Sequence, residues 1–307
     1  MNAVLRCLTR FTFARTALAS ALAAGIVTAA QAASSVPVPV VAAENFYGDL
    51  ASQIGGSHVA VKSIMSNPDQ DPHLFETSPS TARELSAARV VVYNGAAYDA
   101  WMDKLLSASP RPARVTIEAA SLVGKNPGDN PHLWYLPATM PATAKAVADA
   151  IKQADPSSQA DIDRQLASFI ASLAPINAKI AAMRAKYQGL PVAATEPVFG
   201  YMADAIGLDM RNMHFQIAVM NDTEPSASDL AAFQQDLSER RVKVLLYNGQ
   251  VSDETTRKML AIAKQSGVPV VGVTETEPNG MNYQRWMLHQ LDALDAALSS
   301  KPGANAK

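Results

Sequence analysis

Short apolar runs alternate along this chain with longer segments in which apolar residues recur every three or four positions. Val38 to Ala42 is a continuous apolar run of the kind found in strands of a buried parallel sheet. Asn45 to Ile54 then shows helical spacing and ends at the pair Gly55-Gly56. The pattern predicts a strand followed by a helix, which is the unit from which α/β folds are built.

The same unit occurs a second time. Pro39 to Gly48 (PVVAAENFYG) corresponds to Pro191 to Gly200 (PVAATEPVFG), at an offset of 152 residues. Val90 to Gly95 (VVVYNG) corresponds to Val244 to Gly249 (VLLYNG), at an offset of 154. Because both halves repeat a buried strand with the same kind of turn after it, the chain predicts two similar α/β lobes with parallel sheets.

A long amphipathic segment lies between the two repeats. Asp155-Pro156 is a helix start with a capping acid and a proline at the first position. Apolar residues then recur at steps of three and four as far as Tyr187, which predicts one connecting helix. At 1.5 Å per residue this helix would be about 50 Å long, and Pro175 should bend it.

The first 32 residues have the pattern of a secretory signal peptide. Three arginines and no acidic residue accompany the apolar run Ala17 to Ala30, and Ala30-Gln31-Ala32 is a small-residue cleavage site. A signal anchor is the alternative, but the run is shorter than the ~20 residues that a membrane span needs. The single cysteine, Cys7, precedes the apolar run, so the cysteine of a lipoprotein signal is missing and the cleaved product has no thiol.

Charge and length restrict the possible partners and the organisation. Cleavage removes three of 26 basic residues and none of 28 acidic ones, so 23 basic and 28 acidic residues remain, a net charge of −5. We therefore expect a soluble periplasmic protein with no nucleic-acid partner. The predicted parts are a signal peptide (1–32), an N-terminal lobe (36–155), a connecting helix (156–188) and a C-terminal lobe (189–302).

Two short motifs place a histidine directly after a proline. They are Asp71-Pro72-His73-Leu74 and Asn130-Pro131-His132-Leu133. Proline fixes its own φ and pushes the preceding residue toward extended geometry, so each histidine follows a stiff approach. Two rigidly held imidazoles suit a metal ion, although chance recurrence of Pro-His-Leu on two surface turns explains this pair equally well.

Two glutamates of the second repeat follow predicted strands. Glu196 follows the strand over 192–195, and Glu275 follows the strand over 268–273. In α/β lobes, ligands bind at the carboxyl ends of the strands. Two histidines facing two carboxylates would form a four-coordinate site, or a site of higher coordination if the carboxylates are bidentate.

Both glutamates also have simpler explanations. Glu196 can open a helix, where the helix dipole favours negative charge, and its counterpart Glu44 in the first repeat is expected to do only that. Glu277 is a close rival of Glu275 for the fourth ligand position.

The order of motifs resembles the metal-binding solute receptors of ABC importers, the bacterial solute-binding protein family 9. The shared motifs cover nearly the whole chain after residue 32, and they are Asp71-Pro72-His73, Tyr93-Asn94-Gly95 with Trp101 six residues later, Pro131-His132-Leu133-Trp134, Thr195 to Tyr201, Glu224-Pro225-Ser226 and Val273-Thr274-Glu275. The resemblance implies two α/β lobes joined by a long rigid helix, with Zn²⁺ or Mn²⁺ in the interlobe cleft. Carried over position by position, the ligands would be His73, His132, Glu196 and Glu275.

The chain departs from both metal types of this family. In zinc-type members, three of the expected metal ligands are histidines, and a histidine-rich loop precedes the second of them. In this chain the third ligand position is Glu196, and residues 121–130 contain no histidine. Manganese-type members usually have aspartate at the fourth place, where this chain has Glu275, and the second Asp-Pro-His motif begins here with Asn130. The resemblance therefore leaves both Zn²⁺ and Mn²⁺ as the expected cargo.

The resemblance implies a monomeric periplasmic receptor that binds a divalent transition metal and delivers it to an ABC importer permease, without enzymatic activity. A periplasmic zinc metallohydrolase is the alternative, because two histidines and a carboxylate also form a catalytic zinc set. The chain has no His-Glu-x-x-His motif, and a fourth protein ligand would close such a site to water. An adhesin is the third interpretation, although the chain has no repeat array or low-complexity stalk.

Overall fold

Two four-stranded parallel sheets form the framework of the protein. The computed structural model describes residues 36–67 and 75–300, so the predicted signal peptide lies outside the described residues. The strands are β1 (Val38–Glu44), β2 (Val59–Met65), β3 (Val90–Tyr93), β4 (Val115–Glu118), β5 (Pro191–Ala194), β6 (Asp209–Arg211), β7 (Leu245–Asn248) and β8 (Val270–Val273). All neighbouring strands pair in parallel.

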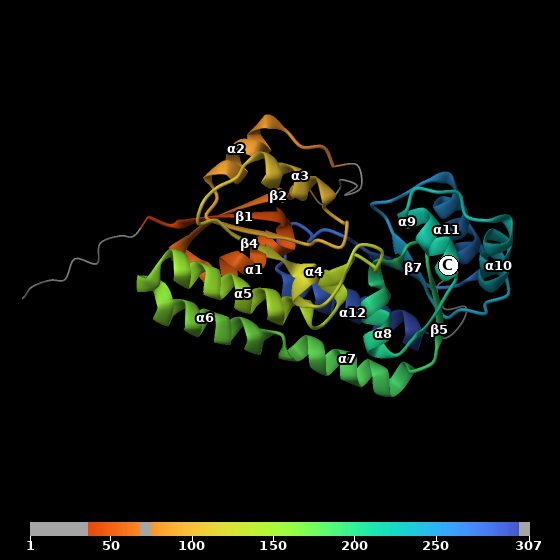
Figure 1. Cartoon of the computed structure of the whole chain (residues 1–307). Helices are drawn as coiled ribbons and strands as arrows, with labels where there is room; N and C mark the ends of the chain where they lie inside the picture. The colour runs from red at the N-terminus through yellow and green to blue at the C-terminus, as the bar shows by residue number, and fades with distance from the viewer. Residues whose placement is uncertain (1–35, 68–74, 301–307) are drawn as a thin grey trace, which may run out of the picture. The chain divides into compact units, whose positions relative to one another are not determined.

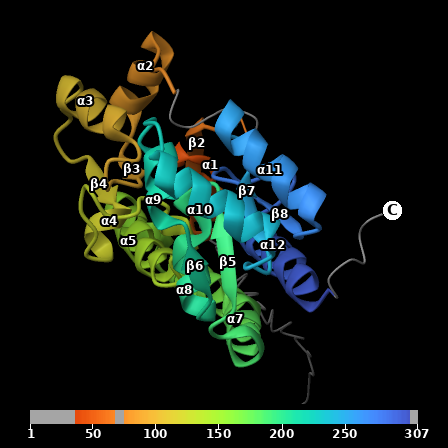
Figure 2. The same ribbon diagram turned by 90° about the vertical axis from the view of Figure 1, so that its right-hand side faces the viewer.

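The strand order shows that the two sheets follow one plan. It is β2-β1-β3-β4 in the first sheet and β6-β5-β7-β8 in the second, so every strand of the first lobe has a counterpart in the same position in the second. Figure 2 looks onto the lobe that contains β5 to β8. The repeats read from the sequence are β1 with β5 and β3 with β7, and the predicted pair of α/β lobes is confirmed.

Helices connect successive strands and pack against the sheets (Figure 1). The α-helices are α1 (Asn45–Gly55), α2 (Pro79–Ala87), α3 (Ala100–Ala108), α4 (Ala119–Leu122), α5 (Thr139–Ala154), α6 (Gln159–Ser172), α7 (Ala174–Tyr187), α8 (Gly200–Ile206), α9 (Met213–Met220), α10 (Ala227–Ser238), α11 (Glu254–Ser266) and α12 (Tyr283–Ser299). Short 3₁₀ helices are η1 (Gly56–His58), η3 (Leu133–Tyr135), η4 (Pro156–Ser158) and η5 (Pro197–Phe199).

The central strands are apolar on both faces because helices cover both. In β1, Val40 and Ala42 face a core that extends through both lobes, whereas Val41 and Ala43 face a separate core beneath α2 and α3. The second sheet repeats this arrangement, with α9, α10 and α11 enclosing its own outer core. Two-sided burial explains why these strands are continuous apolar runs without polar alternation.

The connector consists of two consecutive helices. α6 ends and α7 begins on either side of Leu173, and Pro175 lies in the first turn of α7. Proline lacks the N–H for an intrahelical hydrogen bond and its ring crowds the preceding turn, so the predicted bend falls at this point. Ile162 in α6 and Ile180 in α7 are buried in the shared core. Pro156–Tyr187 is long and apolar enough to cross a membrane by length and composition only.

Aromatic side chains join the two lobes. The ring centroids of Phe46 and Trp286 are 6.0 Å apart, and Tyr135 packs against Phe199 at 5.0 Å and against Trp286 at 5.8 Å. These rings are almost completely buried, within a chain whose residues after Ser34 form one compact unit. A large apolar interface disfavours movement between lobes, so the strand ends on its two sides are held in a defined geometry.

Candidate metal centre

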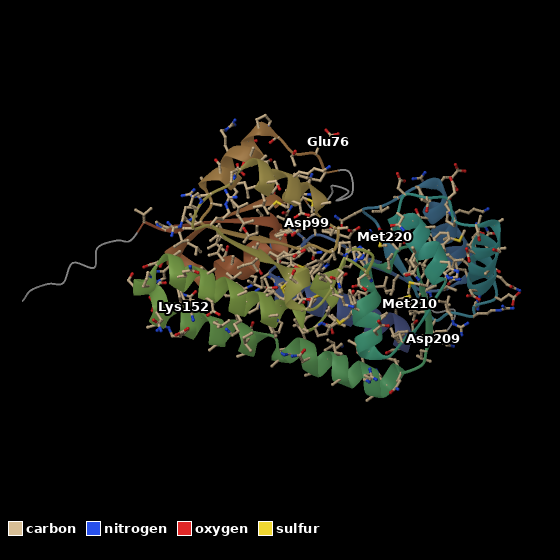
Figure 3. All side chains as sticks on the ribbon, in the orientation of Figure 1. Glu76, Asp99, Lys152, Asp209, Met210 and Met220 are labelled. Atoms are coloured by element: carbon tan, nitrogen blue, oxygen red, sulfur yellow. The ribbon has the colours of Figure 1, made fainter. Side chains whose placement is uncertain are left out.

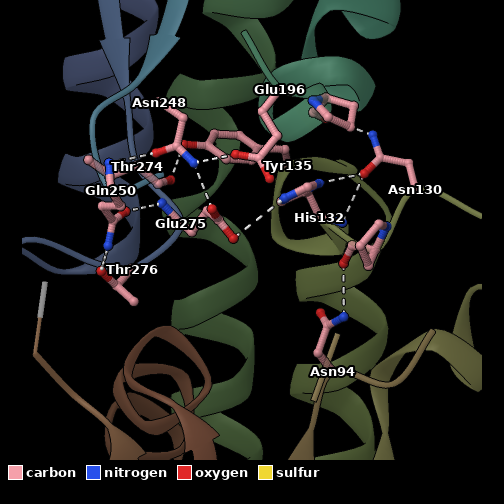
Figure 4. A network of polar contacts seen from close by, with 12 residues as sticks. Asn94, Asn130, His132, Tyr135, Glu196, Asn248, Gln250, Thr274, Glu275 and Thr276 are labelled. Carbon is pink, nitrogen blue, oxygen red and sulfur yellow. Dashed lines mark hydrogen bonds and ion pairs between the residues drawn. The ribbon is translucent and has the colours of Figure 1, made fainter. Parts of the chain in front are cut away.

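Three predicted ligand residues lie at the carboxyl edges of the two sheets. Glu196 follows the end of β5 by two residues, and Glu275 follows the end of β8 by two residues. His132 comes from the other lobe and immediately precedes η3. Parallel strands place their carboxyl ends at one edge, which is where α/β proteins bind ligands. Figure 4 shows the three side chains converging from both lobes.

The ligand atoms of these residues are close enough to share one cation. One atom from each of His132, Glu196 and Glu275 lies within 4.8 Å of the others. The Nε2 atom of His132 is 3.5 Å from Oε2 of Glu275. Since metal–ligand bonds of ~2.0–2.2 Å put two ligands of one ion roughly 3–4 Å apart, small shifts would bring all three into contact with an ion. The three residues are at most 1% exposed.

The sequence analysis named two further candidate ligands, His73 and Glu277. His73 lies outside the described residues, so its role stays a prediction. Glu277 is described and is not part of the cluster. Its backbone is held by the side chain of Asn45, and burial, followed by the charge of Asp49, raises its pKa to about 9. The ligand atoms of Glu275 lie in the cluster and those of Glu277 do not, so the geometry favours Glu275.

Asn130 determines which nitrogen of His132 faces the cluster. Its Nδ2 donates to the carbonyl oxygen of Pro197 at 2.7 Å, and because a carbonyl only accepts, this contact sets the orientation of the amide. Oδ1 therefore accepts, from the backbone N–H of His132 at 3.1 Å and from Nδ1 at 2.6 Å. Nδ1 therefore carries a proton, and Nε2, which has no hydrogen-bond partner among the described residues, faces Glu275.

Asn248, the last residue of β7, holds both carboxylates. Its Nδ2 donates to Oε2 of Glu196 and to Oε1 of Glu275, each at 2.7 Å. The amide itself is oriented because its Oδ1 accepts from the backbone N–H of Gln250 at 3.0 Å. One oxygen of each glutamate is thereby fixed and the other is directed toward His132 (Figure 4). Such outer contacts align ligands before the ion arrives.

Asn94 has the corresponding position after β3 and supports the histidine instead. Its Nδ2 donates to the carbonyl oxygen of Pro131 at 2.8 Å, and its Oδ1 accepts from the hydroxyl of Tyr47 at 3.0 Å. Asn94 therefore holds the backbone of the loop that carries His132, in addition to the hydrogen bonds made by Asn130. Sequence reasoning assigned no role to Asn94 or Asn248, although the repeated Tyr-Asn-Gly motif was the signal that could have indicated one.

Aromatic rings exclude water from the histidine. Trp134 lies edge-on to the imidazole of His132 with centroids 5.4 Å apart, and Tyr98 lies edge-on at 6.1 Å. Tyr135 donates its hydroxyl to the carbonyl oxygen of Thr274 at 2.8 Å, next to Glu275 in the chain. In such a low-dielectric setting the attraction between a cation and carboxylates is much stronger than in water.

A groove of about 370 Å³ lies beside the cluster and is lined by both lobes. Asn130 and Pro131 contribute from the N-terminal lobe, and Pro197, Met210 and Met220 contribute from the C-terminal lobe. Figure 3 labels the two methionines on that lobe. The groove therefore brings solvent to residues that adjoin His132 and Glu196 in the chain.

Glu44 stands at the N-cap position of α1, where the sequence predicts an acid that opens the helix. Its side chain makes no capping hydrogen bond and lies buried beside Asp99. Burial, followed by the charge of Asp99, holds the pKa of Glu44 well above its ordinary value, and burial raises the pKa of Asp99 to about 6. Because two adjacent buried carboxyl groups cannot both ionise at low cost, this position favours the neutral form of Glu44.

Comparison with known proteins identifies the family. Residues 40–297 match the family model described as zinc-uptake complex component A, periplasmic. The chain belongs to this family. It is 23% identical over 281 residues to the manganese-binding lipoprotein MntA of Bacillus subtilis, covering 84% of this chain and 89% of that protein. It is 22% identical over 255 residues to the high-affinity zinc uptake system protein ZnuA of the same organism, covering 75% and 78%.

A solved structure supports the fold. The periplasmic zinc-binding protein TroA from Treponema pallidum superposes with a TM-score of 0.74 at 18% identity, over 86% of this chain and 100% of that one. The predicted family and fold are thus confirmed. The family consists of periplasmic metal-binding receptors of ABC importers, so the chain is a transport receptor and not an enzyme, and nothing in the comparisons supports the metallohydrolase.

Proposed function

We propose that this protein captures Zn²⁺ or Mn²⁺ with His73, His132, Glu196 and Glu275 and delivers the ion to the permease of an ABC importer. The observation that carries the proposal is the meeting of three buried ligand atoms, from both lobes, within 4.8 Å of one another. His73 is included because of its Asp-Pro-His motif. Zinc and manganese appear in the names of relatives that match most of the chain.

The donor atoms of the proposed ligands support a site that accepts both Zn²⁺ and Mn²⁺. Imidazole nitrogen and carboxylate oxygen suit both ions, and the chain after residue 32 contains no cysteine to favour a softer metal. By the Irving–Williams order such a site holds Zn²⁺ more tightly than Mn²⁺ at equilibrium. Bidentate coordination by Glu196 and Glu275 would give Mn²⁺ the higher coordination number that it accepts. Competition titration tests this order, and tighter binding of Mn²⁺ would contradict it.

Metal binding should stabilise the folded protein, because an ion that binds only the folded state shifts the equilibrium by mass action. At a free ion concentration of ~100 Kd the gain is about 2.7 kcal/mol. We expect a rise in melting temperature when Zn²⁺ is added to chelator-treated protein, and no rise in His132→Ala or His73→Ala. His58→Ala is the matched control, since His58 contacts Asp155 and Asp161 at the start of the connector. An unchanged melting temperature in wild type would refute the proposal.

The proposed organisation has separate tests. Residues 1–32 would direct export and be removed, leaving lobes 36–155 and 189–302 joined by the connector 156–188. Mass spectrometry of periplasmic protein should show a chain that begins at residue 33. Light scattering should show a monomer, and the negatively charged product should not bind DNA or RNA at physiological salt. In cells, deletion should slow growth in metal-depleted medium, and added Zn²⁺ or Mn²⁺ should restore it.

A further inference from the structure

The side chain of Asn130 contacts both lobes at once. In its own lobe it accepts from the backbone N–H and from Nδ1 of His132. Across the lobe interface it donates to the carbonyl oxygen of Pro197, the residue after Glu196, at 2.7 Å. The hydroxyl of Tyr201 in α8 donates to the backbone carbonyl of Asn130 at 2.8 Å. The loop that carries one candidate ligand is therefore hydrogen-bonded to the segment that carries another (Figure 4).

Gly200 shows independently that the C-terminal lobe accommodates this amide. A Cβ atom added to Gly200 would lie 2.8 Å from Nδ2 of Asn130, closer than real Cβ contacts come. The backbone of Gly200 has φ −54° and ψ −52°, an ordinary helical conformation that alanine adopts freely. The backbone therefore does not require glycine at this position. The space taken by the amide of Asn130 does.

We propose that Asn130 is a positioning residue that couples His132 to the C-terminal lobe. The inference rests on the proposed metal-binding function and deepens it. A carboxamide is the group that serves both sides, because its oxygen accepts from the imidazole while its nitrogen donates to the Pro197 carbonyl. Aspartate would accept from His132 but would offer no donor to Pro197. By thermodynamic reciprocity, a contact that prepares His132 and Glu196 for a shared ion is strengthened in turn when the ion binds.

The ring nitrogens of His132 provide the first test, which needs no metal. We expect ¹⁵N NMR of the metal-free protein to show the proton on Nδ1 in wild type and in Asn130→Asp. In Asn130→Ala the Nδ1–H acceptor is gone, and both tautomers should be populated. A mixture of tautomers in wild type, or an unchanged single tautomer in Asn130→Ala, would overturn the inference whether or not the protein binds metal.

Zinc affinity tests the interlobe contact through a double-mutant cycle. We expect Asn130→Ala to weaken Zn²⁺ binding about 10–100-fold, as outer contacts to metal ligands commonly do. Gly200→Ala should also weaken it, because the new methyl group displaces the amide. In the Asn130→Ala background the same glycine substitution should have no further effect, since the displaced group is already absent.

The control is Gly272→Ala in β8, where an added Cβ meets nothing within 4 Å. It should leave Zn²⁺ affinity unchanged. Equal losses from Gly200→Ala in both backgrounds, or wild-type affinity in Asn130→Ala, would overturn the role of Asn130 while leaving the proposed function intact. Absence of Zn²⁺ binding by wild type would instead overturn the proposed function and this coupling with it.

Discussion

The two lobes place the same residue types at corresponding strand ends and surround them differently. Glu44 ends β1 and Glu196 follows β5, and both are buried. Glu44 lies beside the carboxyl group of Asp99, and burial together with the charge of Asp99 raises the pKa of Glu44. Glu196 accepts a hydrogen bond from Nδ2 of Asn248, and one of its oxygens lies within 4.8 Å of a ring nitrogen of His132. The neighbours, more than the residue type, distinguish a neutral acid from a candidate metal ligand.

The paired asparagines show the same divergence. Asn94 uses its amide to hold the backbone of the histidine loop, whereas Asn248 uses its amide to hold two carboxylates. One strand position thus supports the nitrogen donor in one lobe and the oxygen donors in the other. The repeat supplies a common scaffold, and the candidate site forms only where the two differently equipped edges face each other.

The largest expected effect is a difference in Zn²⁺ affinity between a variant of Glu196 and the same variant of Glu44. Glu196→Gln should weaken Zn²⁺ binding by more than the 10–100-fold typical of outer contacts, because it removes a proposed ligand charge. Glu44→Gln should leave Zn²⁺ affinity within twofold of wild type. Isothermal titration of the two variants side by side measures this difference. Equal losses would show that the lobes contribute equivalent glutamates, contrary to the comparison above.

Removal of the amide that holds the two carboxylates should have the next largest effect. Asn248→Ala is expected to weaken Zn²⁺ binding about 10–100-fold, because Glu196 and Glu275 lose the donor that aligns them. Asn177→Ala, an exposed position on α7, is the matched control. Competition with a chromophoric chelator gives both affinities. Wild-type binding by Asn248→Ala would mean that the carboxylates align without this contact.

Glu44→Gln should stabilise the metal-free protein at neutral pH. The pKa of Glu44 is raised in the folded state, so above pH ~4.3 the folded protein binds a proton that the unfolded chain has released, and stability falls as pH rises. Glutamine removes this cost, and the gain should be about 1–3 kcal/mol at pH 7 and should vanish near pH 4.

Thermal melts from pH 4 to pH 8 measure that gain. Glu76→Gln, at an exposed position of the same lobe, is the control and should follow wild type (Figure 3). A gain that grows as the pH falls would reverse the sign and refute the account of Glu44.

The smallest expected effect is on the free energy of unfolding, from the ion pairs that attach the connector to each lobe. Side-chain hydrogen bonds, first from Lys179 and then from Tyr187, hold the pKa of Asp295 far below its ordinary value. A lowered pKa contributes stability above the unfolded-state value of ~3.9, and that stability is lost as pH falls toward the folded-state pKa. Asp295→Asn should therefore cost about 1 kcal/mol at pH 7 and progressively less below pH 4.

Asp163 supplies the matched case at the other end of the connector. It pairs with Lys152 at 2.8 Å, but its side chain is 51% exposed, compared with 26% for Asp295. Exposed ion pairs contribute little, so Asp163→Asn should change the free energy of unfolding by less than about 0.5 kcal/mol. Urea denaturation at pH 7 tests both, and a larger loss from Asp163→Asn would contradict the ranking.

The sequence by itself determined the two lobes, the connector and the residues from which a site could form. Apolar runs, repeated turns and the helix break near Pro175 are local features, because neighbouring residues decide strand and helix formation. The Pro-His motif and the position after a strand likewise drew attention to His132, Glu196 and Glu275. Local pattern could not rank Glu275 above Glu277, or distinguish Glu196 from its counterpart Glu44.

Those choices depend on groups that are distant in the sequence. Glu275 faces His132 from the opposite lobe, and Glu277 is held away by Asn45 of α1. The roles of Asn130 and Asn248 were also decided only by tertiary structure, because each depends on which donors and acceptors the fold brings within about 3 Å. Hydrogen bonding and charge act over a few ångströms in space, and no spacing along the chain records which side chains will be neighbours.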